Sequence, residues 1–390
     1  MTKDKTVPTI LEGIHYATGR PVSITIIDGI IAGIEESANL EKENSNLYIA
    51  PGLIDNQING YANVDFSGKS LTAEDVLYAA KAIWRDGVTT FLPTLVTNSH
   101  ENLLRNFTIM NDALGKSSLL QESIPGFHLE GPYISAEEGY RGCHPVQHIR
   151  KPSIAEFGEY QKAAGGRIVE VTIAPELDGA MEFIRSCHND GIIVAMGHTG
   201  ASSAQIIKAV EAGVRLSTHL GNGCANFIHR HNNPIWQQLA NDRLTPSIIG
   251  DGLHLLPEEI KVFVKAKGFD NIILTSDVIF LAGMAPGKYS FLESEVYLTE
   301  EGMLLNSERN CLAGASFPLK SGVGNIIKFI GCSLENAIDM ASGNVARILN
   351  LHERGSLVKG KRADIILFER AGSQIQVKKT YLNGTLVYQE

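Results

Sequence analysis

Eight short apolar segments recur along the middle of the chain, and each one stops at a group of polar residues. They begin near residues 50, 87, 123, 168, 191, 215, 246 and 271. Most of the intervals between them have helical periodicity, as in residues 72–87 and 202–213. Repeated units of a buried strand followed by a helix predict an α/β fold whose parallel sheet closes into a TIM-like (β/α)8 barrel. An open, doubly wound α/β sheet is the alternative.

Both ends of the chain have a different pattern, which is typical of β-hairpins. Residues 22–36 alternate apolar and polar positions around an Asp28-Gly29 turn, and the last two strand-like runs of the chain are joined by Asn383-Gly384. We expect residues 1–50 and 353–390 to form one small β domain and residues 51–352 to form the barrel. Residues 286–304 predict further hairpin strands, which either cover a site as a flap or form a structural excursion.

Composition and charge exclude several classes of protein. Of the 390 residues, 44% are hydrophobic and 20% charged, and no apolar run approaches the roughly 20 residues that cross a bilayer. The net charge of −9, without a Lys/Arg cluster, gives no support for binding nucleic acid or an acidic membrane. The N-terminus lacks the pattern of a signal peptide and the five cysteines are scattered, so we expect a cytoplasmic protein with reduced thiols.

Polar residues gather at the predicted strand ends, where a barrel of this type places its active site. Glu130, His198 and His219 would supply one carboxylate and two imidazoles from three strands, which suits a catalytic metal site with an open position. Asp277 would face that position as general acid and base for a metal-activated water. The structural alternatives are a backbone hydrogen bond for Glu130 and helix caps for His198 and Asp277. The other strand-end residues are Asp55, Gln57, Asn59, Glu176, Asp251 and His254.

A series of short motifs extends over nearly the whole chain. In order they are PGLIDNQINGYANVDF (51–66), TTFLPTLVT (89–97), GFHLEGPYIS (126–135), GCHP (142–145), GHTGAS (197–202), STHLGNG (217–223), GDGLHL (250–255), TSD (275–277), LAGAS (312–316) and GSLVKGKRADIILF (355–368). This series resembles the N-acetylglucosamine-6-phosphate deacetylase family of the amidohydrolase superfamily. The resemblance implies a barrel with a small β-sandwich domain built from both chain termini, and a hydrolase that removes an acetyl group from an amino sugar phosphate.

The resemblance also implies which residues hold the metal. The family's single-metal members have ligands that match Glu130, His198 and His219. Where many amidohydrolases bind a second metal through an H-x-H pair, this chain has Gln57 and Asn59, and amides are poor ligands for transition metals. We therefore expect one divalent metal per subunit, with zinc as the first choice and iron, manganese or cobalt as alternatives.

Further site residues follow from the resemblance. Asp277 matches the general acid and base, and His144 matches a donor that polarises the acetyl carbonyl. We expect neither Cys143 nor Cys224 to be a nucleophile, because an activated water needs no covalent partner. The substrate-binding set comprises Cys143, His144, Asn222, Gly223, Arg230, Asp251, Gly252, Leu253, His254, Leu312, Ala313 and Gly314.

The loop at residues 223–236 departs from the family pattern. In the family, the residue that matches Arg230 reaches the substrate phosphate from the neighbouring subunit, which implies a homodimer. Here two additional histidines, His229 and His231, flank that arginine. Deacetylation is therefore better supported than the identity of the sugar, and an epimeric N-acetylhexosamine phosphate or an unphosphorylated amide stays open.

Two other classes of function compete with a deacetylase. A cyclic-amide hydrolase usually needs two metals and a carboxylated lysine, whereas the fourth predicted strand here ends at Glu176. A non-catalytic relative that only binds sugars has no need of the water-activating set. The intact set of ligands and acid/base residue favours the enzyme.

Overall fold

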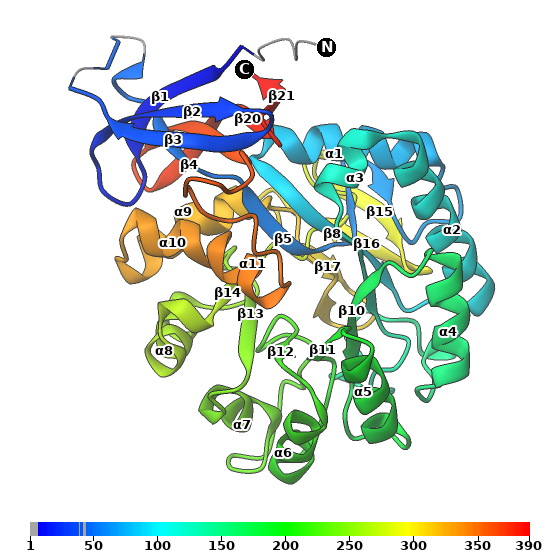
Figure 1. The fold of residues 1–390 in the computed structure, drawn as a ribbon. Coiled ribbons are helices and arrows are strands. Elements are labelled where there is room, and N and C mark those ends of the chain that lie inside the picture. Colours follow the sequence, from blue (N-terminus) through cyan, green and yellow to red (C-terminus); the bar gives the residue numbers. More distant parts are fainter. Residues whose placement is uncertain (1–6, 39, 42–43) are drawn as a thin grey trace.

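An eight-stranded parallel sheet forms the centre of the computed structural model, which describes residues 7–38, 40–41 and 44–390 (Figure 1). Its strands are ordered β14-β13-β12-β11-β10-β9-β8-β5, and neighbours run parallel. They correspond to the eight apolar segments of the sequence. Their bounds are β5 (Leu53–Ile58), β8 (Val88–Val96), β9 (Phe127–Glu130), β10 (Ile168–Ile173), β11 (Ile193–Met196), β12 (Leu216–Ser217), β13 (Thr245–Ile249) and β14 (Ile273–Thr275).

The sheet closes into a barrel just beyond its two outer strands. Ile58, at the end of β5, forms a parallel bridge with Val278, which follows β14. The backbone N–H of Asn59 donates to the carbonyl of Val278 at 2.9 Å. The predicted barrel is therefore confirmed, and the open doubly wound sheet is excluded.

Helices surround the barrel (Figure 1). The predicted helices at residues 72–87 and 202–213 are confirmed as α1 and α6. Helix α1 begins at Thr72, whose hydroxyl accepts from the backbone N–H of Asp75 in a capping box. The bounds are α1 (Ala73–Arg85), α2 (His100–Lys116), α3 (Ser118–Ser123), α4 (Ile154–Ala163), α5 (Ala180–Asn189), α6 (Ser203–Ala212), α7 (Pro234–Ala240), α8 (Pro257–Lys267), α9 (Leu319–Ile330), α10 (Leu334–Met340) and α11 (Gly343–Ile348), with 3-10 turns η2 (Val146–His148) and η3 (Phe269–Asn271).

The two chain ends build one seven-stranded sheet, ordered β21-β20-β19-β4-β1-β2-β3. It encloses its own apolar core, in which Ile24, Ile31, Ile49 and Ile365 are fully buried. The expected sandwich-like domain of both termini is confirmed. Residues 1–6, 39, 42 and 43 lie outside the described part of the chain. The exact domain boundaries stay predictions. The strands are β1 (Thr9–His15), β2 (Pro21–Ile27), β3 (Ile30–Glu36), β4 (Tyr48–Pro51), β19 (Ile365–Ala371), β20 (Gln374–Leu382) and β21 (Thr385–Gln389).

A smaller antiparallel sheet interrupts the chain between β14 and α9. The hairpin predicted at residues 286–304 is confirmed, and two further short strands extend it. Its members are β15 (Gly287–Phe291), β16 (Ser294–Leu298), β17 (Leu304–Asn306) and β18 (Cys311–Leu312); a two-stranded ribbon, β6 (Gly60–Tyr61) and β7 (Val64–Asp65), follows β5.

Among the described helices, none combines the length and the apolar character that crossing a membrane requires. All five cysteines are free.

Two hairpin turns from opposite ends of the chain meet in the terminal sheet. Asp28 and Gly29 connect β2 to β3 with φ angles of 51° and 77°, and Asn383 and Gly384 connect β20 to β21 with φ angles of 48° and 75°. Positive φ at both positions is what a two-residue type I′ turn requires. The turns are so close that a Cβ at Gly29 would lie 2.4 Å from the side-chain oxygen of Asn383.

We therefore predict that Gly29→Ala destabilises the protein more than Gly19→Ala does. Both glycines have positive φ, so both variants acquire the roughly 1–2 kcal/mol of left-handed strain. Only Gly29 adds a clash, since nothing lies within 4 Å of a Cβ at Gly19. The measurement is the urea midpoint of unfolding; equal midpoints for the two variants would contradict the close packing of the turns.

Candidate active site

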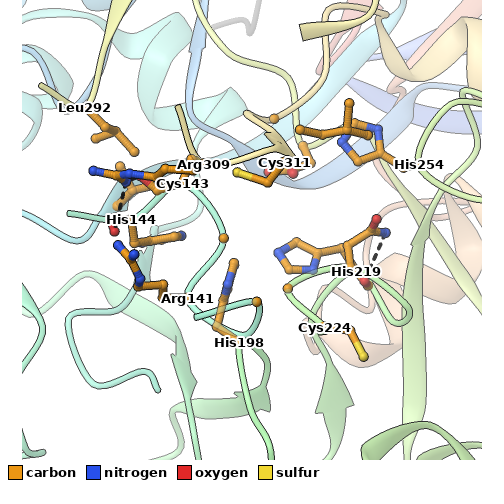
Figure 2. A pocket seen from close by; sticks show the side chains of 18 of the residues that line it. Arg141, Cys143, His144, His198, His219, Cys224, His254, Leu292, Arg309 and Cys311 are labelled. Atoms are coloured by element: carbon orange, nitrogen blue, oxygen red, sulfur yellow. Dashed lines mark hydrogen bonds between the residues drawn. The ribbon is translucent and has the colours of Figure 1, made fainter. Parts of the chain in front are cut away.

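A cavity of about 410 Å³ opens at the carboxyl ends of the barrel strands (Figure 2). Glu130 is the last residue of β9, and the other predicted site residues follow β11, β12 and β14 closely. Glu130, His198, His219 and Asp277 all line the cavity. The structure thus brings together the four residues that the strand ends predicted.

The Glu130 carboxylate is the centre of a buried cluster. Its Oε1 lies 2.8 Å from His219 Nε2 and 3.4 Å from His198 Nε2. Burial by itself raises the pKa of Glu130, but hydrogen bonds and charge from the two histidines outweigh it and hold the pKa well below its usual range. Glu130 is therefore ionised and faces two imidazole nitrogens, so the plain alternative of a backbone hydrogen bond does not describe it.

The hydrogen bonds of His198 orient a lone pair toward that carboxylate. Its Nδ1 lies 2.9 Å from the backbone carbonyl of Tyr140, and a carbonyl can only accept, so Nδ1 carries the hydrogen. In a neutral ring, Nε2 then presents a lone pair to Glu130 Oε1. Two electron-rich atoms at 3.4 Å repel each other unless a cation or a proton lies between them. This arrangement fits a divalent metal.

His144 joins the same cluster from the loop after β9. One ligand atom each of Glu130, His144 and His198 lie within 4.8 Å of one another, and the rings of His144 and His198 are 4.4 Å apart. His144 Nδ1 lies 2.8 Å from the hydroxyl of Thr97, directly beyond β8. Burial lowers the pKa of His144 to about 3, so its ring is neutral. A neutral imidazole fixed in this way can donate to a substrate carbonyl or act as a further ligand.

Asp277 is held by the two amides that replace the H-x-H pair. The side-chain amides of Gln57 and Asn59 each donate to Asp277 Oδ1 at 2.8 Å. Burial raises the pKa of Asp277 above its usual range, while the neighbouring His219 opposes the shift. Asp277 lines the cavity, and Oδ2 is the oxygen left for a water or a substrate. The amides at the position of the H-x-H pair therefore hold the Asp277 carboxylate in one orientation.

Three of these residues have unusual backbone conformations. His198, His219 and Asp277 have φ angles of 50°, 31° and 51°. Residues other than glycine rarely adopt a positive φ angle, and such backbone conformations concentrate at functional sites. Each residue lies two positions beyond the end of a strand, where the turn aims its side chain across the mouth of the barrel.

The predicted substrate-binding residues divide into two groups. Those that line the cavity are Cys143, His144, Asn222, Gly223, His254, Leu312 and Gly314. Those that do not line it are Arg230, Asp251, Gly252, Leu253 and Ala313. Burial raises the pKa of the Cys143 thiol, which disfavours the thiolate and agrees with its expected lack of nucleophilic function.

Two acidic residues at strand ends support neighbours of the cavity instead of lining it. Asp251 Oδ2 accepts from His254 Nδ1 at 2.7 Å, which leaves His254 Nε2 for the cavity. Glu176 accepts from the Thr199 hydroxyl and from the backbone N–H of Gly200, in the loop that follows His198. Both carboxylates position a loop that carries a histidine.

Several lining residues were not predicted. Arg141 and Arg309 bring two guanidinium groups to the cavity, and Leu292 comes from the turn between β15 and β16 (Figure 2). Phe291, the last residue of β15, also lines the cavity. The sheet of residues 287–312 therefore forms one wall of the cavity, which favours the flap over a mere structural excursion. The polar run at 306–310 was the only signal for Arg309 in the sequence.

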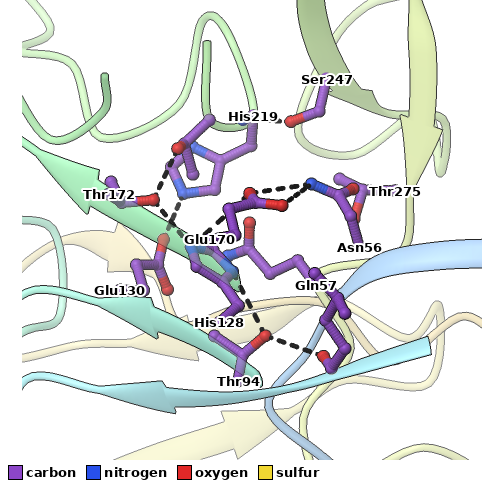
Figure 3. Close-up of polar contacts among 12 residues, drawn as sticks. Asn56, Gln57, Thr94, His128, Glu130, Glu170, Thr172, His219, Ser247 and Thr275 are labelled. Atoms are coloured by element: carbon purple, nitrogen blue, oxygen red, sulfur yellow. Dashed lines mark hydrogen bonds and ion pairs between the residues drawn. The ribbon is translucent and has the colours of Figure 1, made fainter. Parts of the chain in front are cut away.

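A hydrogen-bonded polar layer lies inside the barrel beneath the cavity (Figure 3). His128 Nε2 is 2.8 Å from the Thr172 hydroxyl, and Asn56 donates to the Glu170 carboxyl at 3.0 Å. Burial lowers the pKa of His128 to about 4 and raises that of Glu170 to about 8, and the two side chains lie 3.7 Å apart. Thr172 also bonds to Thr218 at 2.7 Å, next to His219. This layer supports the strands that carry the site.

Comparisons with known proteins agree with this geometry. The model of the amidohydrolase family matches residues 48–387. The chain belongs to the amidohydrolase family. Its relatives in that family include the N-acetylglucosamine-6-phosphate deacetylases of Bacillus subtilis, 33% identical over 343 residues (87% of this chain and 84% of the relative), and Bos taurus, 33% identical over 368 residues (90% and 86%).

Solved amidohydrolase structures are similar over almost the whole chain. The N-acetylglucosamine-6-phosphate deacetylase of Thermotoga maritima superposes with a TM-score of 0.87 at 28% identity, covering 98% of this chain and all of that one. The Mycobacterium smegmatis enzyme, as a variant in complex with N-acetyl-D-glucosamine-6-phosphate, has a TM-score of 0.88 at 26% identity and the same coverage. The chain therefore has the same fold as these deacetylases over almost its whole length.

Metal content tests the cluster around Glu130. We predict that Glu130→Gln reduces the bound divalent metal from about one per chain to a small fraction, because a neutral amide is a poor ligand. Glu138→Gln is the matched control, since Glu138 lines the same cavity but is exposed and outside the cluster. Elemental analysis after dialysis measures the result, and an unchanged metal content in Glu130→Gln would contradict the assignment.

Proposed function

We propose that the protein is a metal-dependent deacetylase that hydrolyses N-acetylglucosamine 6-phosphate to glucosamine 6-phosphate and acetate. The observation that carries this proposal is the placement of Asp277 and His144 in one cavity with the Glu130 carboxylate and its two imidazoles. Relatives that are named N-acetylglucosamine-6-phosphate deacetylase align with this chain over most of their length, and they support the choice of reaction. A cyclic-amide hydrolase is less well supported, because Glu176 binds the loop after β11 where such enzymes use a lysine.

Glu130, His198 and His219 are the proposed metal ligands. A divalent metal at this site would lower the pKa of a water toward neutrality and polarise the acetyl carbonyl. We propose zinc as the metal, with iron, manganese and cobalt as alternatives that accept the same nitrogen and oxygen ligands. One metal per subunit is expected, because Gln57 and Asn59 are engaged as donors to Asp277.

Two residues of the chain move or hold protons in the proposed reaction. Asp277, fixed through Oδ1 by its two amide donors, accepts a proton from the attacking water at Oδ2 and delivers it to the leaving amine. His144, when its Nδ1 accepts from the Thr97 hydroxyl, carries a hydrogen on Nε2, and this N–H donates a hydrogen bond to the acetyl oxygen as negative charge develops there.

The phosphate of the substrate is assigned to Arg230 of a neighbouring subunit in a homodimer. Arg230 is exposed and does not line the cavity of its own chain, which suits a residue that acts on another. Its loop also exposes Phe227 (95%) and Trp236 (54%), two aromatic side chains that a subunit interface would cover.

The five free cysteines support a cytoplasmic location.

Acetate release from three substrates tests the proposed function. Purified protein of known metal content is given N-acetylglucosamine 6-phosphate, its galacto epimer and unphosphorylated N-acetylglucosamine. We expect the first to react fastest. Faster release from the epimer would mean that the substrate is N-acetylgalactosamine 6-phosphate. Faster release from the unphosphorylated sugar would mean that the site does not require a phosphate. No release from any of the three would overturn the proposed function.

The role of Asp277 is tested by Asp277→Asn. We predict that the variant retains its metal and loses activity by about two to four orders of magnitude, because an amide cannot accept the proton of the water. Asp242→Asn, an exposed substitution of the same kind, serves as the control. Turnover near that of the unmodified protein would refute the acid/base assignment.

Truncation of the proposed phosphate contact should affect binding more than chemistry. We predict that Arg230→Ala raises KM for the phosphorylated substrate about tenfold or more and leaves kcat within a few fold, as loss of a remote binding contact does. The exposed Arg243→Ala is the control. An unchanged KM, measured in the dimeric protein, would remove Arg230 from the phosphate site.

A further inference from the structure

Arg309 lies in a turn that is fixed to the wall of the cavity. The turn joins β17 to β18, where Asn306 pairs with Cys311. Asn306 is buried; its side-chain oxygen accepts from the backbone N–H of Arg309 at 3.1 Å, and its amide donates to the Ser294 hydroxyl on β16 at 2.8 Å. The backbone of Arg309 is thus anchored to the β15–β18 sheet, and its side chain extends from a defined point.

The guanidinium of Arg309 binds the backbone of the loop that carries His144. Its Nη1 donates to the carbonyl of Cys143 and, at 3.1 Å, to the carbonyl of His144 (Figure 2). Among the described residues, no other side chain donates to either carbonyl. Hydrogen bonds from a charged donor are stronger than neutral ones, and two from one guanidinium also fix direction.

His144 is consequently held from two sides. Thr97, beyond the end of β8, binds the ring at Nδ1, whereas Arg309, from the β15–β18 sheet, binds the backbone. The same sheet touches this loop again, because Glu293 accepts from Gln147 and lies 3.8 Å from His148. A donor that stabilises an oxyanion must be placed to within a fraction of an ångström, so its loop needs such supports.

We propose that Arg309 is a positioning residue for the deacetylation reaction: it holds the loop of His144 so that the imidazole meets the acetyl oxygen in the transition state. This inference rests on the proposed function for its kinetic consequence. The structural part, that Arg309 orders the loop at residues 142–146, stands independently of the substrate. The proposal gives the sheet of residues 287–312 a second part in the site: it forms a wall of the cavity, and it also holds the loop of His144.

The kinetic test compares Arg309→Met and Arg309→Lys with Lys288→Met. Lys288 is on β15 of the same sheet and pairs with Glu295 at the exposed surface, so its loss should change nothing. We expect Arg309→Met to lower kcat about ten- to a hundredfold with KM within about twofold, and Arg309→Lys to retain an intermediate kcat because its ammonium can reach one carbonyl. A raised KM at unchanged kcat would overturn the proposal, since it would mean that the guanidinium binds substrate directly.

A double-mutant cycle distinguishes positioning from general stability. If Arg309 acts through His144, Arg309→Met should lower kcat little further in a His144→Gln background. An equal loss in both backgrounds would overturn the proposal. Metal content and thermal midpoint are measured on every variant, and loss of metal in Arg309→Met would assign the effect to the metal cluster instead.

Hydrogen exchange separates this inference from the proposed function. In Arg309→Met the backbone amide of His144, which donates to the carbonyl of Arg141 at 3.1 Å, should exchange about tenfold faster or more than in the unmodified protein. The amides of Gly142, Cys143 and Val146 report on the same segment, and Lys288→Met should not change any of them. This readout needs no substrate. If the protein deacetylates none of the three sugars while the loop loses protection, the proposed function fails and the structural role holds; unchanged exchange would overturn the role of Arg309 whatever the activity.

Discussion

Closure of the barrel between Ile58 and Val278 is the constraint on which the site depends. Asn59 and Asp277 are the residues directly beside this bridge, so the ring cannot close without bringing the first and last strand ends together. Only then do the amides of Gln57 and Asn59 reach the Asp277 carboxylate. Closure also sets Glu130, His198 and His219 on the same rim, facing one another across a few ångströms. The chemistry of the site is thus a property of the complete ring.

The polar interior of the barrel holds several buried ionisable groups, each of which has a hydrogen-bonding partner. Removing an unpaired charge from water costs several kcal/mol, and the ionised Glu130 offsets this through His198 and His219. Below it, burial shifts the pKa of His128 to about 4 and that of Glu170 to about 8, and both side chains bond to hydroxyl or amide groups. The two imidazoles nearest Glu130 are therefore placed where a metal fits, above strands that are supported by hydrogen-bonded polar groups.

The alternation of strands and helices, and the position of the main site residues, follow from the sequence by one rule. A polar residue directly after a buried strand faces the rim of a closed barrel, which located Glu130, His198, His219 and Asp277. The same rule does not tell a residue that lines the cavity from one that orients its neighbour, as Asp251 orients His254.

Other features depend on packing that no local pattern contains. Arg309 reaches the His144 loop from a turn of the inserted sheet, and which segment such a turn approaches depends on how that sheet sits on the barrel. Asn56 and Glu170 meet inside the ring although β8 and β9 separate their strands, whereas a strand buried on both faces gives no sign of which side chains point inward.

The sheet shared by the two chain ends has a consequence for biosynthesis. Strand β4 pairs with β19 through Ala50 and Ile366, so the N-terminal strands emerge from the ribosome long before their partner is translated. The nascent β1–β4 unit must wait, with the β4 edge unpaired, while the barrel forms between the two halves of the sheet. Completion of this sheet therefore requires that the chain beyond the barrel has been translated.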